Sequence, residues 1–297
     1  MSYSNVLTAC DHLIDLHAWR ADKIDPHGWI ANFDVSDRPL AAELLRRFTF
    51  YADPLVDQLY LSAFQTLSNI AAQQWQTFDA AKQDWRTFLS GALITWVQGE
   101  RPHPADSGQI FIRKARQLLG FAEKQMCSPE EAVRRIGAGH SGAVIFVDDF
   151  VGSGEQFLTT WARTYPDQNL PAFKTALAAR PNVFYCNLMT TEWGVERITM
   201  GAPEVTIACG NIISRASTLV GAGSASWPTT TQLIEIQALV KTYSAKLGYG
   251  EDGGGEWDWE GFHKLGLGLA FEHSTPDASL PIFHSQENGW TPLVRRT

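Results

Sequence analysis

One short segment near the middle of the chain constrains the fold more than any other. Residues 143–147 read Ala-Val-Ile-Phe-Val, a continuous apolar run rich in β-formers. Such a run is typical of a central parallel strand with both faces covered. Because neighbouring parallel strands are joined by crossover connections, it predicts an α/β fold with a mostly parallel sheet.

The patterns before and after this strand predict further strands that alternate with helices. These strands are predicted at residues 109–112, 183–188, 205–208 and 265–271. Helices are predicted from apolar spacing and capping residues at residues 4–20 and 36–50, from Asp53, at 114–121, from Ser128 to 136, and from Glu155 onward. Residues 85–97 are strongly apolar and fit a helix or a strand. We therefore expect a helical N-terminal region over residues 1–84 and an α/β domain over residues 85–297.

Charge and apolar patterning narrow the classes of partner. The net charge of −8 argues against unaided nonspecific binding to nucleic acid, because that affinity comes from Lys and Arg that displace counterions. No apolar stretch of the sequence approaches the ~20 residues that span a bilayer, and the first residues lack the pattern of a secretory signal. The sequence thus predicts a cytoplasmic protein without a membrane partner. The cysteines lack the paired spacing of zinc or iron–sulfur sites, and we expect four buried thiols, at Cys10, Cys127, Cys186 and Cys209.

The segment after the central strand combines the features of a ligand-binding loop. Two adjacent carboxylates, Asp148 and Asp149, precede a small-residue loop at 152–154 and a helix that opens at Glu155. In open α/β sheets, ligands bind beyond the carboxyl ends of the strands. Glycines let the backbone approach a ligand, and the amides that enter a helix attract anions. The loop suits a phosphate, and the acidic pair suits sugar hydroxyls or a hydrated divalent cation. A strand that ends in a solvated acidic turn is the alternative interpretation.

Other motifs in this part of the chain fit less well. Residues 137–142 match GxGxxG, but they precede the strand, whereas the dinucleotide-binding fingerprint follows one. Residues 139–143 approach GxSxG, but Ala143 replaces the final glycine. The sequence contains no GxxxxGK[ST] motif. A receiver domain needs a phosphoacceptor Asp on a later strand, and residues 183–190 contain none.

The order of strand, acidic pair, two variable residues and Gly-Ser-Gly loop over residues 144–156 resembles the signature of type I phosphoribosyltransferases. The resemblance implies their α/β fold and a site for phosphoribosyl pyrophosphate (PRPP). Carried over by position, Asp148 and Asp149 bind the ribose hydroxyls, and the 5-phosphate lies against Val151, Gly152, Ser153, Gly154, Glu155 and Gln156. It also implies Mg²⁺, held mainly through the substrate, with Asp148 and Asp149 as its candidate protein ligands.

Three segments make the chain similar to one divergent branch, the phosphoribosyltransferase-like effectors of bacterial conflict systems (PRTase-CE type), some of them associated with retrons. They are the helical region at 32–48, the motif at 147–156, and the tail at 271–281 that continues to 290–293. The branch implies a role in antiphage defence and a protein partner within a defence system.

Glu155 and Gln156 stand where the ordinary enzymes usually carry a small residue and a threonine. A carboxylate beside a phosphate repels it unless it points away or meets a cation. Two hypotheses therefore remain: a glycosyltransferase that transfers or cleaves at the ribose anomeric carbon of PRPP or a related nucleotide-sugar phosphate, and a catalytically silent protein that senses such a ligand.

Three further residues are candidates for the pyrophosphate side of the site: Ser107, Gly108 and Arg113. An ordinary turn and an amphipathic helix explain them equally well. His273 follows the strand predicted at 265–271 and is a candidate acid or base at the same sheet edge. A structural histidine is the alternative there.

Overall fold

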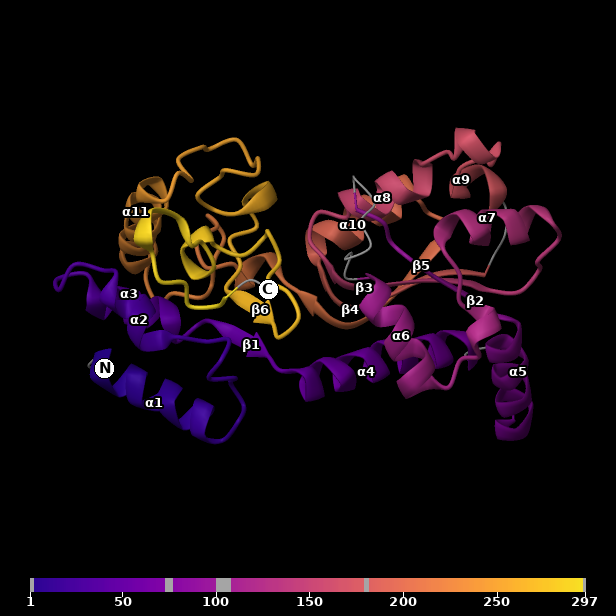
Figure 1. Ribbon diagram of the computed structural model, residues 1–297, viewed down its shortest axis with the longest axis horizontal. Helices are drawn as coiled ribbons and strands as arrows, with labels where there is room; N and C mark the ends of the chain where they lie inside the picture. Colours follow the sequence, from indigo (N-terminus) through magenta and orange to yellow (C-terminus); the bar gives the residue numbers. More distant parts are fainter. Residues whose placement is uncertain (1–2, 73–76, 100–107, 179–181, 296–297) are drawn as a thin grey trace. The chain divides into compact units, whose positions relative to one another are not determined.

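The computed structural model describes residues 3–72, 77–99, 108–178 and 182–295. The chain forms two compact units (Figure 1). Unit 1 combines both ends of the chain, Met1–Val56 and Ser214–Thr297, and unit 2 is the continuous segment Asp57–Ile213. This division differs from the predicted single boundary at residue 84, because residues 214–297 complete the core of the N-terminal helices.

Unit 2 is built on a four-stranded parallel sheet with the order β2-β3-β4-β5. Its strands are β2 (Leu93–Trp96), β3 (Val144–Val151), β4 (Val183–Thr191) and β5 (Val205–Ile213). Its helices are α4 (Asp53–Ala72, which begins in unit 1), α5 (Phe78–Gly91), α6 (Gly108–Leu119), α7 (Pro129–Gly137), α8 (Glu155–Ala162), α9 (Phe173–Ala176) and α10 (Glu192–Gly201), with 3-10 turns η1 (Glu123–Gln125) and η2 (Pro166–Gln168). The predicted α/β class with a parallel sheet is confirmed.

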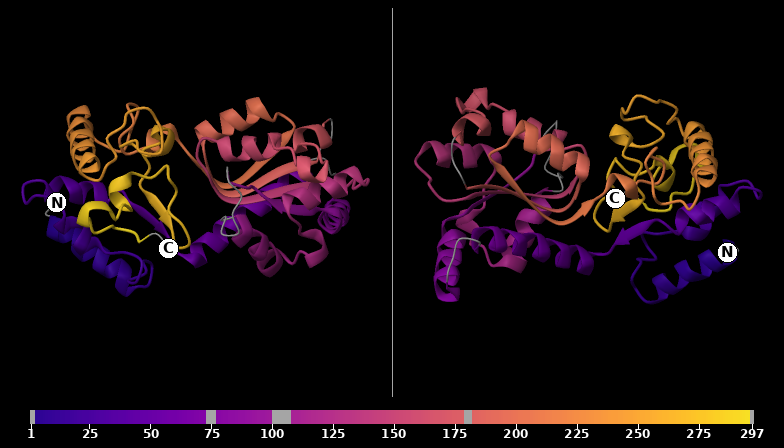
Figure 2. Two further views of the ribbon diagram at one scale, coloured as in Figure 1. Left: turned by 45° about the horizontal axis from the view of Figure 1, so that its top comes forward. Right: turned by 180° about the vertical axis from the view of Figure 1, so that it is seen from behind.

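The two faces of this sheet are covered by different helices. Helices α7 to α10 lie over one face, and α4 and α6 lie over the other (Figures 1 and 2). Phe146 of β3 meets Phe157 of α8 at 5.4 Å and Phe173 of α9 at 4.8 Å between ring centroids. The apolar run at 143–147 is buried throughout, as expected for a central parallel strand.

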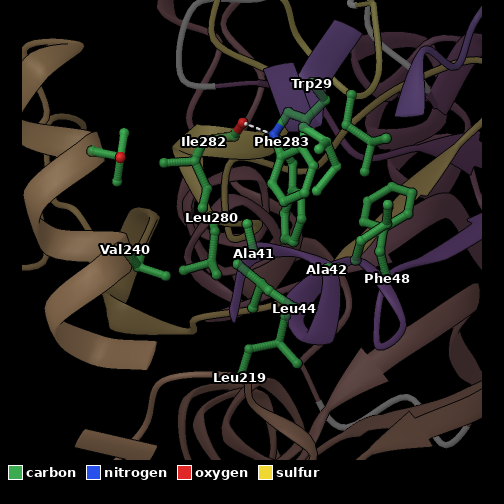
Figure 3. Close-up of a cluster of buried hydrophobic side chains, with 14 of the residues drawn as sticks. Trp29, Ala41, Ala42, Leu44, Phe48, Leu219, Val240, Leu280, Ile282 and Phe283 are labelled. Carbon is green, nitrogen blue, oxygen red and sulfur yellow. Dashed lines mark hydrogen bonds between the residues drawn. The ribbon is translucent and has the colours of Figure 1, made fainter. Parts of the chain in front are cut away.

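Unit 1 joins segments from both ends of the sequence in one core. It contains α1 (Tyr3–Asp15), α2 (Pro26–Ala31), α3 (Arg38–Leu45), β1 (Thr49–Tyr51), α11 (Thr230–Lys246) and β6 (Leu269–Phe271), with 3-10 turns η3 (Arg215–Ser217), η4 (Phe262–Lys264), η5 (Pro281–Phe283) and η6 (Glu287–Gly289). Strands β1 and β6 pair in parallel. The fully buried Trp29 stacks on Phe283 and donates its indole N–H to the carbonyl of Ile282 at 2.7 Å (Figure 3).

Several predicted elements differ from those observed. The strand predicted at 109–112 is wrong, because these residues form the start of α6, in which Phe111 and Ala115 are buried one turn apart. Residues 85–97 divide between a helix and a strand, since α5 ends at Gly91 and β2 begins at Leu93. The strand predicted at 265–271 is limited to β6, because Gly266 has a positive φ of 57°. The helices predicted at 4–20 and 36–50 end early, at Asp15 and Leu45.

Two further expectations concern the burial of the four cysteines and the lack of a helix that could span a membrane. Cys10, Cys127 and Cys186 are buried as expected, whereas Cys209 is partly exposed, and all four are free. Burial raises the pKa of Cys10 and of Cys127 to about 11. Among the helices of the described residues, none has the length and apolarity to cross a membrane.

Candidate functional site

The acidic pair lies inside strand β3. The described pairing of β2 with β3 ends at Trp96 and Val147, whereas β4 follows β3 as far as Val151. Asp148 and Asp149 are 2% and 7% exposed, respectively. The two carboxyl groups are therefore buried at the carboxyl end of the sheet, and a solvated acidic turn does not describe them.

Both oxygens of Asp148 accept hydrogen bonds. The Tyr185 hydroxyl of β4 donates to Asp148 Oδ2 at 2.8 Å, and the backbone N–H of Asp149 donates to Asp148 Oδ1 at 3.0 Å. Asp149 Oδ1 in turn accepts from the N–H of Phe150 at 2.8 Å. Burial and then the negative charge of Asp149 raise the pKa of Asp148 well above its ordinary value.

The loop after the strand is held by close backbone packing. Gly154 has a φ of +75°, and a Cβ there would lie 2.9 Å from Cγ1 of Ile198 on α10. A Cβ on Gly194 would lie 2.7 Å from the carbonyl oxygen of Gly152. Thr191 caps α10 by accepting from the Gly194 N–H at 3.0 Å, and its hydroxyl donates to the Gly152 carbonyl at 2.5 Å. The loop is thus fastened to the first turn of α10.

Helix α8 presents its amino-terminal end at this loop. Gly154 is its N-cap residue, and the N–H of Glu155 donates to Ser153 Oγ at 3.3 Å. The unpaired N–H groups of a helix's first turn and its dipole favour an anion. Gln156 is exposed on this turn, while Ser153 and Gly154 are buried. This arrangement can hold a phosphate group.

The carboxylate of Glu155 has a basic neighbour. Arg197 of α10 places Nη1 3.8 Å from Glu155 Oε2, and both side chains are partly exposed. The charge that the sequence analysis singled out as repulsive is therefore countered by a guanidinium from the neighbouring helix.

The other predicted site residues occupy different places. Ser107 lies outside the described residues. Gly108 begins α6 close to the end of β2, where a Cβ would lie 2.8 Å from Cβ of Trp96, and Arg113 is exposed on the same helix. His273 follows β6 in unit 1, and β6 pairs with β1 rather than with the four-stranded sheet. His273 therefore does not follow a strand of the four-stranded sheet, contrary to the sequence-based prediction, because β6 belongs to another sheet.

Strand β4 contributes polar residues that the sequence analysis did not select. Asn187 pairs in register with Asp148 and is fully buried. Its Oδ1 accepts from the Thr190 hydroxyl at 2.6 Å, and its Nδ2 has no hydrogen-bond partner among the described residues. The signal available in the sequence was the presence of Tyr185 and Asn187 in a strand that otherwise reads as apolar.

A second polar cluster lies where β2 ends. The buried side chain of Gln98 accepts from Arg163 Nη1 at 3.0 Å and from the Tyr165 hydroxyl at 3.3 Å, and donates to Glu130 at 2.9 Å. Arg163 also donates to the carbonyl of Gly99 at 2.7 Å. These contacts fasten the chain at the carboxyl end of β2, next to β3.

The described residues contain no group of three or more His, Cys, Asp or Glu side chains placed to hold a metal ion. Asp148 and Asp149 alone supply two hard oxygen ligands, which fits Mg²⁺ bound by one or two carboxylates together with phosphate oxygens of a ligand.

Fold and site together define a phosphoribosyltransferase-like protein: a parallel α/β sheet, an acidic pair at a strand end, and a glycine loop that opens a helix. The family model PRTase-CE matches residues 26–296, which include segments of both units. The chain belongs to the PRTase-CE family, and the resemblance seen in the sequence is confirmed. None of the curated proteins compared with the chain matches it.

Proposed function

We propose that the chain binds PRPP or a related nucleotide-sugar phosphate at the carboxyl end of β3 and transfers or cleaves at the ribose anomeric carbon. The observation that carries this proposal is the continuous order of buried strand, acidic pair, glycine loop and helix over Val144–Ala162. Membership of the PRTase-CE family supports the same class of ligand.

The ligand's phosphate is assigned to the amides of the α8 amino terminus. Gly152 and Gly154 carry no side chain that could cover these amides, and Ser153 adds a hydroxyl. The ribose is assigned to the neighbouring acidic pair, because carboxylates accept hydrogen bonds from hydroxyl groups. Both groups would lie beyond the strand end where ligands of open α/β sheets bind.

In the reaction, the bond between the anomeric carbon and the leaving phosphate oxygen breaks, and that oxygen takes the electron pair. The acceptor, a nucleobase or water, forms a new bond to the same carbon and releases its proton to the solvent. The protein's contribution is to position the two reactants and to stabilise the charge of an oxocarbenium-like transition state. A divalent cation, when bound, neutralises the negative charge of the departing phosphates.

The direct test is incubation with PRPP, Mg²⁺ and a panel of nucleobases, followed by mass spectrometry. We expect wild type to form a ribosylated product or to release pyrophosphate, and Asp148→Asn/Asp149→Asn to form far less. The exposed Asp167 on η2 offers a matched control, since Asp167→Asn removes a carboxylate from unit 2 outside the site. Equal turnover by wild type and the double variant would refute PRPP chemistry at this site.

A second candidate function is binding without turnover. Glu155 favours it, because the ordinary enzymes usually carry a small residue at this position. A carboxylate at the phosphate loop weakens the binding of a highly charged substrate such as PRPP unless Arg197 compensates its charge. Calorimetry with PRPP and nucleotides separates the two. Tight binding with no product supports a sensor, whereas product formation supports the enzyme.

We also propose that the protein acts as an effector in antiphage defence, together with a protein partner. The free thiols support a reducing compartment such as the cytoplasm. Plaque counts on cells that express wild type or the double variant with its neighbouring genes test this role. Equal plaque numbers would argue against it.

A further inference from the structure

We infer that Tyr185 is a positioning residue of the proposed ribose site and that Asp148 and Asp149 have different roles there. This inference rests on the proposed function. Tyr185 and Asp148 set the geometry of the strand end, and Asp149 is the residue whose carboxylate contacts the ligand's hydroxyls.

Tyr185 itself is held in a fixed orientation. It is 1% exposed, and its ring stacks on Phe157 of α8 with centroids 4.4 Å apart and an interplanar angle of 18°. Phe157 lies two residues after Glu155, the first residue of the helix that presents its amino terminus at the phosphate loop. The tyrosine therefore joins the acidic pair to the phosphate-binding helix through one rigid side chain.

The hydroxyl of Tyr185 fixes one oxygen of Asp148. Its 2.8 Å hydrogen bond to Oδ2 holds the carboxyl group, so that Oδ1 receives the backbone N–H of Asp149 at 3.0 Å. Each oxygen of Asp148 already accepts a hydrogen bond, and Asp148 is 2% exposed against 7% for Asp149, so Asp148 is the less accessible of the two carboxyl groups to a ligand hydroxyl. Asp148 thus orients the backbone from which the Asp149 side chain projects.

The variant that tests this is Tyr185→Phe, which keeps the ring and its stacking but removes the hydroxyl. Tyr60→Phe is the matched control. Tyr60 is also fully buried in unit 2, and its hydroxyl donates to the carbonyl of Phe111 at 3.2 Å, outside the acidic pair. Both variants lose one buried hydroxyl hydrogen bond, so a merely structural effect would appear in both.

Two measurements separate positioning from stability. In the ligand-free protein, carbon-13 NMR of the labelled Asp148 carboxyl group should shift in Tyr185→Phe and stay unchanged in Tyr60→Phe. In calorimetry with Mg²⁺, Tyr185→Phe should weaken PRPP binding about tenfold, the equivalent of one hydrogen bond, and leave binding of inorganic phosphate unchanged. Phosphate has no ribose hydroxyls, so it reports on the loop alone.

The division of roles predicts a ranking of the acid variants. Asp149→Asn should weaken PRPP binding strongly. Asp148→Asn should weaken it no more than Tyr185→Phe, because the amide oxygen can still accept from the Asp149 N–H and the NH₂ group can donate to the Tyr185 hydroxyl. The inference is overturned if Asp148→Asn is as severe as Asp149→Asn, or if Tyr185→Phe behaves like Tyr60→Phe in both measurements. If wild type binds no PRPP, the proposed function fails, and the NMR result alone decides whether Tyr185 positions Asp148.

Discussion

Gly154 illustrates how one residue shapes the phosphate loop. Its φ of +75° lies in the left-handed region, and the space at its Cα is filled by Ile198. Any side chain at this position would therefore destabilise the folded state in two ways: through the strain of a positive φ and through crowding against Ile198 of α10.

Replacing this glycine should destabilise the protein and damage the loop. We expect Gly154→Ala to lower the free energy of unfolding by about 2–4 kcal/mol, as strain at a positive φ and crowding add. Gly120→Ala is the control, because its φ of +72° is almost the same but nothing lies within 4 Å of its added Cβ. Urea unfolding of both variants isolates the contact with Ile198, and equal losses would show that this contact is unimportant.

The raised pKa of Asp148 leads to a prediction on pH-dependent stability. A carboxyl group whose pKa is raised on folding stabilises the folded state fully below its unfolded pKa, and this contribution is lost as the pH rises through the folded pKa. Asp148→Asn, which carries no such proton, should therefore be more stable than wild type at pH 7.

The difference in stability between Asp148→Asn and wild type should shrink as the pH falls toward the ordinary pKa of an aspartate. Thermal unfolding at pH 7 and pH 4 in metal-free buffer measures it. A difference that grows as the pH falls would contradict the direction assigned to the Asp148 pKa.

At the scale of elements, the ion pair between Arg197 of α10 and Glu155 of α8 sets the charge at the phosphate loop. Glu155→Gln should strengthen the binding of inorganic phosphate or PRPP several-fold, because it removes the negative charge at the helix end and releases Arg197. Arg197→Gln should weaken binding by a similar factor. Calorimetry at low and high salt checks both, since the effect of partly exposed charges is screened by salt. Asp167→Asn is the distant control, and a decrease in affinity for Glu155→Gln would refute the repulsion argument.

Elements with strong local signals were predicted well. Ser128 caps α7 by accepting from the Glu131 N–H at 3.3 Å, and α8 begins at Glu155 as expected. The first turn of α6 was mistaken for a strand, because Ile110, Phe111 and Ile112 form an apolar β-branched and aromatic run. Only packing against the sheet reveals that Phe111 and Ala115 share one helical face.

At the scale of the whole molecule, the division into units predicts which fragments fold. Unit 2 is continuous and has its own core, so a fragment of residues 53–213 should give helical circular dichroism and a cooperative unfolding transition. A fragment of residues 1–84 should not unfold cooperatively, because Trp29 and Phe48 pack on Phe283 from the other end of the chain. Addition of residues 214–297 should restore protected amides in hydrogen exchange. Cooperative unfolding of 1–84 alone would instead support a boundary at residue 84.

The sequence by itself determined the central strand, the acidic pair, the loop and the start of α8, because their signals are local and contiguous over residues 143–156. The same residues carried the resemblance that the family match confirms. Only the tertiary structure decided that Asp148 is held by Tyr185, 37 positions later, that Arg197 faces Glu155, and that residues 214–297 complete the core of the N-terminal helices. These contacts depend on which strands pair and which helices cover each face, and long-range packing sets both.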